Sequence, residues 1–206
     1  MIAMANDCCT IRIGQQVPDF KLEIFDPVKN DFGEITLAAQ KAAKKWTVLF
    51  FYPADFTFVW ATEFAALAER HEEFKKAGAE VITVSTDTKF VHLAWQRDEK
   101  MLEKVKYPMG SDTTGKLAKA FGVYDEATGL ALRGTFIINP DGVLLNSEIN
   151  FYNLGRNIEE TLRKINANKH LVAAPTEACP AQWKKEGDKT LKPSAKIVGK
   201  IYEEMK

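Results

Sequence analysis

The chain has 206 residues, of which 46% are hydrophobic and 27% are charged, a composition that predicts a globular protein with a sizeable core. Its 28 Lys and Arg residues equal its 28 Asp and Glu residues, so no excess charge exists to attract nucleic acid or an anionic membrane surface. No apolar run reaches the length of a bilayer span, and the first residues do not form a secretory signal, so we expect no membrane association and a cytoplasmic protein.

In chain order, the first elements are predicted from hydrophobic periodicity. Residues 17–25 alternate apolar and polar side chains, which is typical of an edge strand or a hairpin arm. The continuous apolar run 46–52 and the run 79–86 each predict a strand buried on both faces. Between them, apolar residues recur at helical spacing from residue 62 to 77, and Gly78 follows as a stop signal.

The second half of the chain continues the alternation of helices and strands. Helices are expected over 88–104, 115–121 and 156–171, and two strands within 133–149 are expected to join at a tight turn over 139–142. This order of elements predicts an α/β fold, with a mixed or parallel sheet and helices on both faces.

After Val172 the composition changes to proline, lysine and few branched apolar residues. This part predicts a C-terminal arm that lies on a surface, with a short last helix over about 194–205. We therefore expect a first domain over residues 1–172 and an arm over 173–206.

Three cysteines, Cys8, Cys9 and Cys179, are too few and too oddly placed for a disulfide-stapled secreted domain. The chain has no Cys-x-x-Cys pair and no cluster of His and Cys, so we expect neither a metal nor a cofactor. Cys8 and Cys9 precede the first predicted element and are expected to be idle, with a vicinal disulfide or metal capture as the alternative.

The stretch 50–64 carries the strongest indication of chemistry. Pro53 breaks a buried strand, and a loop then leads into a helix predicted to begin near residue 61. Trp60 therefore lies at or just before the first helical turn, where unpaired backbone N–H groups and the positive end of the helix dipole meet. A thiol at this position would become a thiolate at neutral pH, with Pro53 as a shield and Thr57 as a nearby hydroxyl.

This stretch resembles the active-site segment of the typical 2-Cys peroxiredoxins of the alkyl hydroperoxide reductase C type. Their pattern is Pro-x-x-x-Thr-x-x-Cys, usually continued by Pro-Thr-Glu. The chain matches this pattern at Pro53, Thr57, Thr62 and Glu63. It departs at Trp60, where the peroxidatic cysteine belongs, and at Ala61, where proline is usual.

Three further segments extend the resemblance to roughly residues 10–190. His92-x-x-Trp95 is similar to a helix motif of the family, and Arg133-Gly-Thr-Phe-Ile-Ile carries the arginine that steadies thiolate and peroxide. The segment from Glu177 to Trp183 is similar to the one that bears the resolving cysteine, here Cys179.

The resemblance implies a thioredoxin-like fold and a homodimer in which the arm of one subunit reaches the active site of the other. It also implies a ring of five or six dimers. In the family a thiolate attacks peroxide to give a sulfenic acid, and the resolving thiol condenses with it to a disulfide. Thioredoxin or a dedicated flavoprotein disulfide reductase then restores the dithiol.

An indole cannot replace sulfur as the nucleophile, so the chain with Trp60 is predicted to be inactive toward peroxides. It is either an engineered variant of a working peroxidase, which the intact surroundings favour, or a natural pseudoenzyme. Three functions compete: a peroxidase disabled at Trp60, a ring-forming scaffold or holdase, and a thiol carrier or sensor that works through Cys179.

The local structure around Trp60 can also be predicted. Fitting an indole into a space shaped for cysteine costs about 1–3 kcal/mol or more, whereas opening a helix start costs little. We therefore expect residues 56–63 to open, Trp60 to point away from Arg133, and the arm around Cys179 to be poorly ordered. The alternative is an enlarged pocket with the helix start intact.

Overall fold

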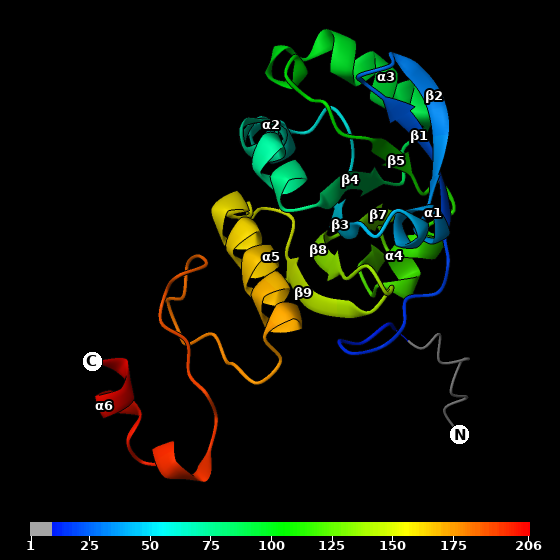
Figure 1. Cartoon of the computed structure of the whole chain (residues 1–206). Helices are drawn as coiled ribbons and strands as arrows, with labels where there is room; N and C mark the ends of the chain where they lie inside the picture. The colour runs from blue at the N-terminus through cyan, green and yellow to red at the C-terminus, as the bar shows by residue number, and fades with distance from the viewer. Residues whose placement is uncertain (1–9) are drawn as a thin grey trace, which may run out of the picture. The chain divides into compact units, whose positions relative to one another are not determined.

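The computed structural model describes residues 10–206 (Figure 1), so Cys8 and Cys9 lie outside the described residues. The chain divides after Ile158 into two compact units, the second running from Glu159 to Lys206. The division expected after residue 172 stays a prediction.

The first unit is built on a seven-stranded mixed sheet with the strand order β2-β1-β5-β4-β3-β8-β9. Its strands are β1 (Lys21–Asp26), β2 (Asp31–Thr36), β3 (Trp46–Phe51), β4 (Ala79–Ser85), β5 (Met109–Ser111), β8 (Arg133–Ile138) and β9 (Leu144–Asn150). β4 pairs in parallel with β3 and β5, and the other pairs are antiparallel. A separate two-stranded sheet joins β6 (Tyr124–Asp125) to β7 (Leu130–Ala131). The predicted α/β fold with a mixed sheet is confirmed.

Helices cover both faces of the sheet because the buried strand β3 has apolar side chains on both sides. The helices of this unit are α1 (Leu37–Ala42), α2 (Phe58–Lys76), α3 (Lys89–Asp98), the 3₁₀ helix η1 (Lys100–Leu102) and α4 (Lys116–Ala120). On one face, Phe51 packs against Phe121 at the end of α4, with ring centroids 5.7 Å apart. On the other face, Phe50 packs against Phe74 of α2 at 6.5 Å. Figure 1 accordingly shows α2 and α4 on opposite sides of β3.

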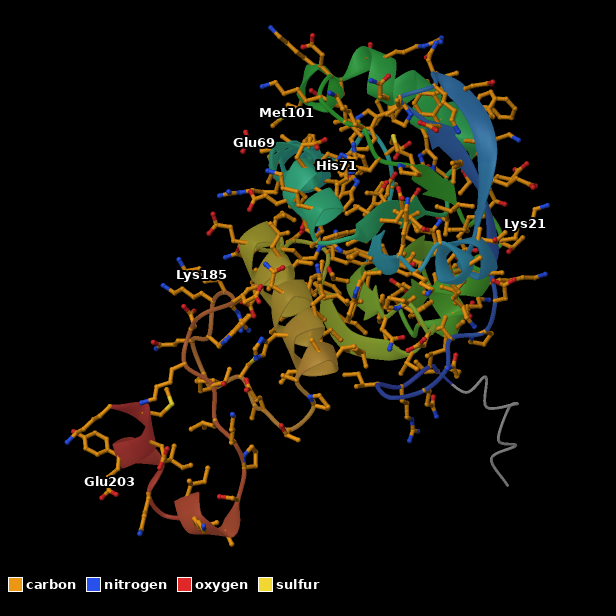
Figure 2. The ribbon with its side chains drawn as sticks, viewed as in Figure 1. Lys21, Glu69, His71, Met101, Lys185 and Glu203 are labelled. Carbon is orange, nitrogen blue, oxygen red and sulfur yellow. The ribbon has the colours of Figure 1, made fainter. Side chains whose placement is uncertain are left out.

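The helix α2 positions the candidate site. It begins at Phe58 rather than near residue 61, after Thr57 in an extended conformation, and it ends at Lys76, before Gly78 with φ +74°. One face of α2 is buried and the other is exposed, as is typical of a surface helix: His71 is buried and Glu69 is exposed (Figure 2). The predicted helix was therefore correct in kind and end but started too late.

Several other boundaries differ from those predicted. The helix expected over 88–104 is broken at Glu99, which is extended (φ −89°, ψ 109°) and separates α3 from η1. The strand within 17–25 is a hairpin arm, as predicted, but it is not an edge strand, because β1 pairs with both β2 and β5. The elements β2, α1, β5, β6 and β7 were not predicted. β5, β6 and β7 have only two or three residues, and the six residues of β2 and of α1 show no clear period of apolar side chains.

The turn between β8 and β9 is confirmed. The N–H of Gly142 donates to the carbonyl of Asn139 at 2.9 Å, which closes the turn expected over 139–142. Gly142 has φ +86°, a conformation that glycine adopts without strain.

The second unit contains α5 (Ile158–Ala173, apart from its first residue) and the arm. Within the arm, Ala178 and Leu191 exchange backbone hydrogen bonds of 2.8 and 2.9 Å. The last predicted helix is split into the 3₁₀ helix η2 (Ala195–Ile197) and α6 (Ile201–Met205), with Gly199 at φ +77° between them. Across residues 10–206, no helix is long and apolar enough to cross a membrane.

Candidate active site

Trp60 lies in the first turn of α2 and is fully buried, with 0% of its surface exposed. Its indole stacks on the ring of Tyr52, with centroids 4.3 Å apart and planes 13° apart. Phe64, one turn further along α2, meets the indole edge to face at 4.9 Å. The indole therefore occupies an aromatic slot between the end of β3 and the start of α2.

The expected opening of residues 56–63 is wrong. The helix is formed from Phe58 onward, and Trp60 does not point away from Arg133, whose guanidinium carbon lies 5.7 Å from the centre of the indole. The physical reason is that stacked and edge-to-face aromatic neighbours stabilise the buried indole, so filling the slot costs less than exposing it. The helix start is intact, as the alternative expected, and the indole is buried behind it.

Beside the indole, Glu63 holds two buried arginines. Its Oε2 accepts a hydrogen bond of 2.8 Å from Nη1 of Arg133. Arg156 donates to the same carboxylate from its backbone N–H at 2.6 Å, from Nε at 3.1 Å and from Nη2 at 3.2 Å. All three side chains are at most 4% exposed. A buried carboxylate thus compensates the charges that would otherwise be isolated in the core.

The two arginines are oriented by further acceptors. Nε of Arg133 donates to the carbonyl of Tyr152 at 2.6 Å, and Nη1 of Arg156 donates to the carbonyl of Gly134 at 2.9 Å. Burial lowers the pKa of Arg156 and Glu63 opposes that shift, so the guanidinium stays protonated at neutral pH.

Both guanidinium groups also face the indole. The guanidinium carbon of Arg156 lies 4.7 Å from the centre of the Trp60 ring, closer than that of Arg133. The guanidinium groups of Arg133 and Arg156 share the single carboxylate of Glu63. The π face of the indole adds a favourable cation–π contact with each of them. The indole Nε1–H of Trp60 is buried and has no hydrogen-bond partner among residues 10–206.

The other residues expected at this site contribute less directly. Pro53 is buried two residues after the end of β3, as a strand breaker would be. Thr57 is the N-cap of α2, but its hydroxyl donates to the carbonyl of Ala54 at 2.8 Å rather than capping the helix. Of the predicted residues, the structure therefore joins Trp60, Glu63 and Arg133 in one contact network, with Thr57 at its helical border.

Arg156 was not predicted from the sequence. It lies in the segment between β9 and α5, far from the other site residues along the chain. The only indication of Arg156 in the sequence was its place at the start of the helix predicted over 156–171. An arginine at such a place is ordinarily a surface charge.

A second buried network adjoins the aromatic slot. The phenol of Tyr52 donates a 2.6 Å hydrogen bond to Oδ1 of Asp55, and Oδ2 of Asp55 lies 2.7 Å from Nδ1 of His92. Nε2 of His92 lies 3.1 Å from the carbonyl of Gly110. Burial raises the pKa of Asp55, and its contact with His92 opposes that shift. His92 was noticed in the sequence as part of a motif, but its pairing with Asp55 was not.

Cys179 lies in the second unit as a half-buried free thiol. Burial raises its pKa; the charge of Arg163 opposes the shift, and that of Glu177 adds to it. The nearby carboxylate of Glu177 lies 2.9 Å from Nε2 of His170 and accepts a 2.7 Å hydrogen bond from Thr190. The thiol is therefore not activated in this environment.

Comparison with known proteins supports the resemblance seen in the sequence. The sequence model of the AhpC/TSA family matches residues 13–147. Alkyl hydroperoxide reductase C of Staphylococcus aureus is 46% identical over 189 residues, covering 92% of this chain and 98% of the relative.

Solved structures of similar proteins support the same family. The crystal structure of Enterococcus faecalis AhpC superposes with a TM-score of 0.78 at 37% identity, covering 83% of this chain and 100% of that one. The reduced 2-Cys peroxiredoxin of Plasmodium vivax superposes with a TM-score of 0.83 at 32% identity, covering 91% and 98%. The chain therefore belongs to the AhpC/TSA family, and it is a peroxiredoxin with the thioredoxin-like fold.

Proposed function

We propose that this chain is a thiol peroxidase whose peroxidatic position is held by Trp60, so that in its present form it does not turn over peroxides. The observation that carries the proposal is the location of Trp60, in the first turn of α2 and against the guanidinium groups of Arg133 and Arg156. That environment suits a thiolate, because helix N–H groups and two cations stabilise negative charge. An indole in the same place cannot attack an O–O bond as a thiolate does, because its nitrogen lone pair is part of the aromatic system.

The burial of the site supports inactivity independently of the missing thiol. Trp60 is 0% exposed and Arg133 is 3% exposed, so the arginine expected to steady peroxide is covered. A peroxide molecule would have to displace the stacked indole before it could reach Arg133. We propose that Pro53, Thr57, Glu63 and Arg133 form the remainder of the peroxide site.

Cys179 is proposed as the resolving position, with thioredoxin or a flavoprotein disulfide reductase as the electron donor of the working enzyme. A thiol carrier or sensor that works through Cys179 alone is a weaker proposal. Its raised pKa leaves less thiolate at neutral pH, and the thiolate is the species that exchanges with disulfides.

The second candidate function is a ring-forming scaffold or holdase. Phe58 is 95% exposed, Phe90 61% and Phe56 54%, which is unusual for large aromatic side chains on a folded monomer. These three residues, here called the exposed phenylalanine set, support the proposal of a homodimer that assembles into a ring of five or six dimers.

The test is a matched pair of variants, Trp60→Cys and Trp60→Ser. Both replace the indole by a small side chain, and only the first supplies a thiol. We expect Trp60→Cys to consume hydrogen peroxide with a dithiol reductant, and Trp60→Ser and the parent chain to remain at background. Turnover by the parent chain would contradict the proposal, and a folded but inactive Trp60→Cys protein would favour the scaffold.

A further inference from the structure

We propose that Trp60 and Tyr52 form a one-electron relay, in which an electron lost from the indole is replaced from Tyr52 while the phenol proton moves to Asp55. This activity is independent of peroxide reduction, because it needs no thiol. It rests on the stacking of two redox-active rings, the hydrogen bond of one ring to a proton acceptor, and the charges around the other.

The two rings are placed for electron exchange. Their centroids are 4.3 Å apart and their planes differ by 13°, so the π systems are in van der Waals contact over their faces. Both side chains are fully buried. A radical on either ring is therefore shielded from water.

The surroundings of Trp60 disfavour a lasting radical on the indole. Removing an electron leaves a radical cation, which normally relaxes by losing the Nε1 proton, but that N–H has no acceptor within residues 10–206. The positive charge would also face the guanidinium groups of Arg156 at 4.7 Å and Arg133 at 5.7 Å. At these distances in a buried site, repulsion between like charges is substantial.

The surroundings of Tyr52 favour a neutral radical there. Its phenol donates to Oδ1 of Asp55 at 2.6 Å, so the proton can move along an existing hydrogen bond as the electron leaves. Burial raises the pKa of Asp55, which makes this carboxylate a better proton acceptor than an exposed one.

His92 holds the second oxygen of Asp55, the carboxylate that would accept the phenol proton. A carbonyl oxygen only accepts, so Nε2 of His92 carries a proton toward Gly110 at 3.1 Å. Nδ1 then shares one proton with Oδ2 of Asp55 at 2.7 Å. When the shared proton lies on Nδ1, Asp55 is a carboxylate, and its Oδ1, which accepts the phenol hydrogen bond, can take the phenol proton.

The electrons and protons balance as follows. A small oxidising radical, such as the azide radical, takes one electron from Trp60 and becomes the azide anion. One electron then passes from Tyr52 to the indole, the O–H bond of the phenol breaks, and a new O–H bond forms at Oδ1 of Asp55. The products are a neutral indole, a neutral tyrosyl radical and a protonated Asp55.

Tyr107 provides an internal comparison. It is also fully buried, and its ring lies 5.5 Å from that of Phe64. Its phenol, however, donates to the backbone carbonyl of Phe64 at 2.9 Å, and a peptide carbonyl does not take up a proton at neutral pH. The proton acceptor therefore distinguishes Tyr52 from Tyr107.

The experiment is pulse radiolysis of the full chain with azide radical, which oxidises tryptophan first. The conversion of the indole radical-cation absorption to tyrosyl absorption is followed in the parent chain and in Tyr52→Phe, Tyr107→Phe and Asp55→Asn. We expect most of the conversion to be lost in Tyr52→Phe, where the aromatic stack remains, and retained in Tyr107→Phe.

Asp55→Asn tests the proton step, because the amide oxygen keeps the hydrogen bond but does not accept the proton. We expect the indole radical cation to live longer in this variant than in the parent chain. Conversion in Tyr52→Phe equal to that of the parent chain, or an equal loss in Tyr107→Phe, would overturn the relay. Unchanged conversion in Asp55→Asn would overturn the assignment of Asp55 as the acceptor.

Discussion

The carboxylate of Glu63 and the guanidinium of Arg156 form a bidentate pair, with Oε1 at 3.1 Å from Nε and Oε2 at 3.2 Å from Nη2. The same carboxylate holds Nη1 of Arg133 at 2.8 Å. One glutamate from the second turn of α2 therefore ties the start of β8 and the segment before α5 to the helix that carries Trp60.

Replacement of Glu63 by glutamine should destabilise the chain severely. The change keeps the shape but removes the carboxylate charge that two buried guanidinium groups share, a loss of about 3–5 kcal/mol for a broken buried pair. Urea unfolding followed by circular dichroism measures it. Glu69→Gln, on the exposed face of the same helix (Figure 2), is the control and should stay within about 0.5 kcal/mol of the parent. Equal effects of the two changes would contradict the role of Glu63.

Truncation of Trp60 should also lower stability. Because the indole is fully buried against Tyr52 and Phe64, Trp60→Ala leaves a cavity that costs about 3–5 kcal/mol. The same reasoning predicts that Trp60→Cys, which should restore activity, is less stable than the parent chain. Chemical denaturation of both variants tests this, and a gain in stability would indicate that the indole strains its slot.

Assembly should depend on the exposed phenylalanine set. Phe58 is 95% exposed in the single chain, so Phe58→Asp should leave the fold intact and weaken self-association by placing a charge in an apolar contact. Light scattering at micromolar concentration measures the change in mass. Val28→Asp, at another exposed apolar position (66%), is the matched control and should not alter the mass. A loss of mass in both variants would indicate a nonspecific effect.

Cys179 should react slowly for a thiol that is not fully buried. Burial raises its pKa, so at pH 8 the folded chain holds a smaller thiolate fraction than the unfolded chain. With Cys8 and Cys9 replaced by serine, we expect alkylation by iodoacetamide to be slower in the folded chain than in urea. The folded rate should continue to rise at pH values where the unfolded rate has levelled off. Faster alkylation of the folded chain would contradict the raised pKa.

The sequence by itself determined the class of fold, because long buried elements have a period that does not depend on their neighbours. The apolar run 46–52 became β3, the helical spacing after Thr62 became most of α2, and the turn over 139–142 is closed by a hydrogen bond between its first and last residues. Short elements such as β5 and β7 were missed, since two or three residues carry no period and are formed by pairing with distant strands.

The sequence also singled out Trp60, Glu63 and Arg133, because the segments that carry them resemble motifs of a known family. Only the tertiary structure decided how they interact. Arg156 joins them from a distant segment, and no local signal marks a residue whose partner lies far along the chain. The exposure and direction of the Trp60 side chain were predicted wrongly for the same reason. Whether an indole is strained or stabilised depends on the rings and charges that the fold brings around it, here Tyr52, Phe64 and two guanidinium groups.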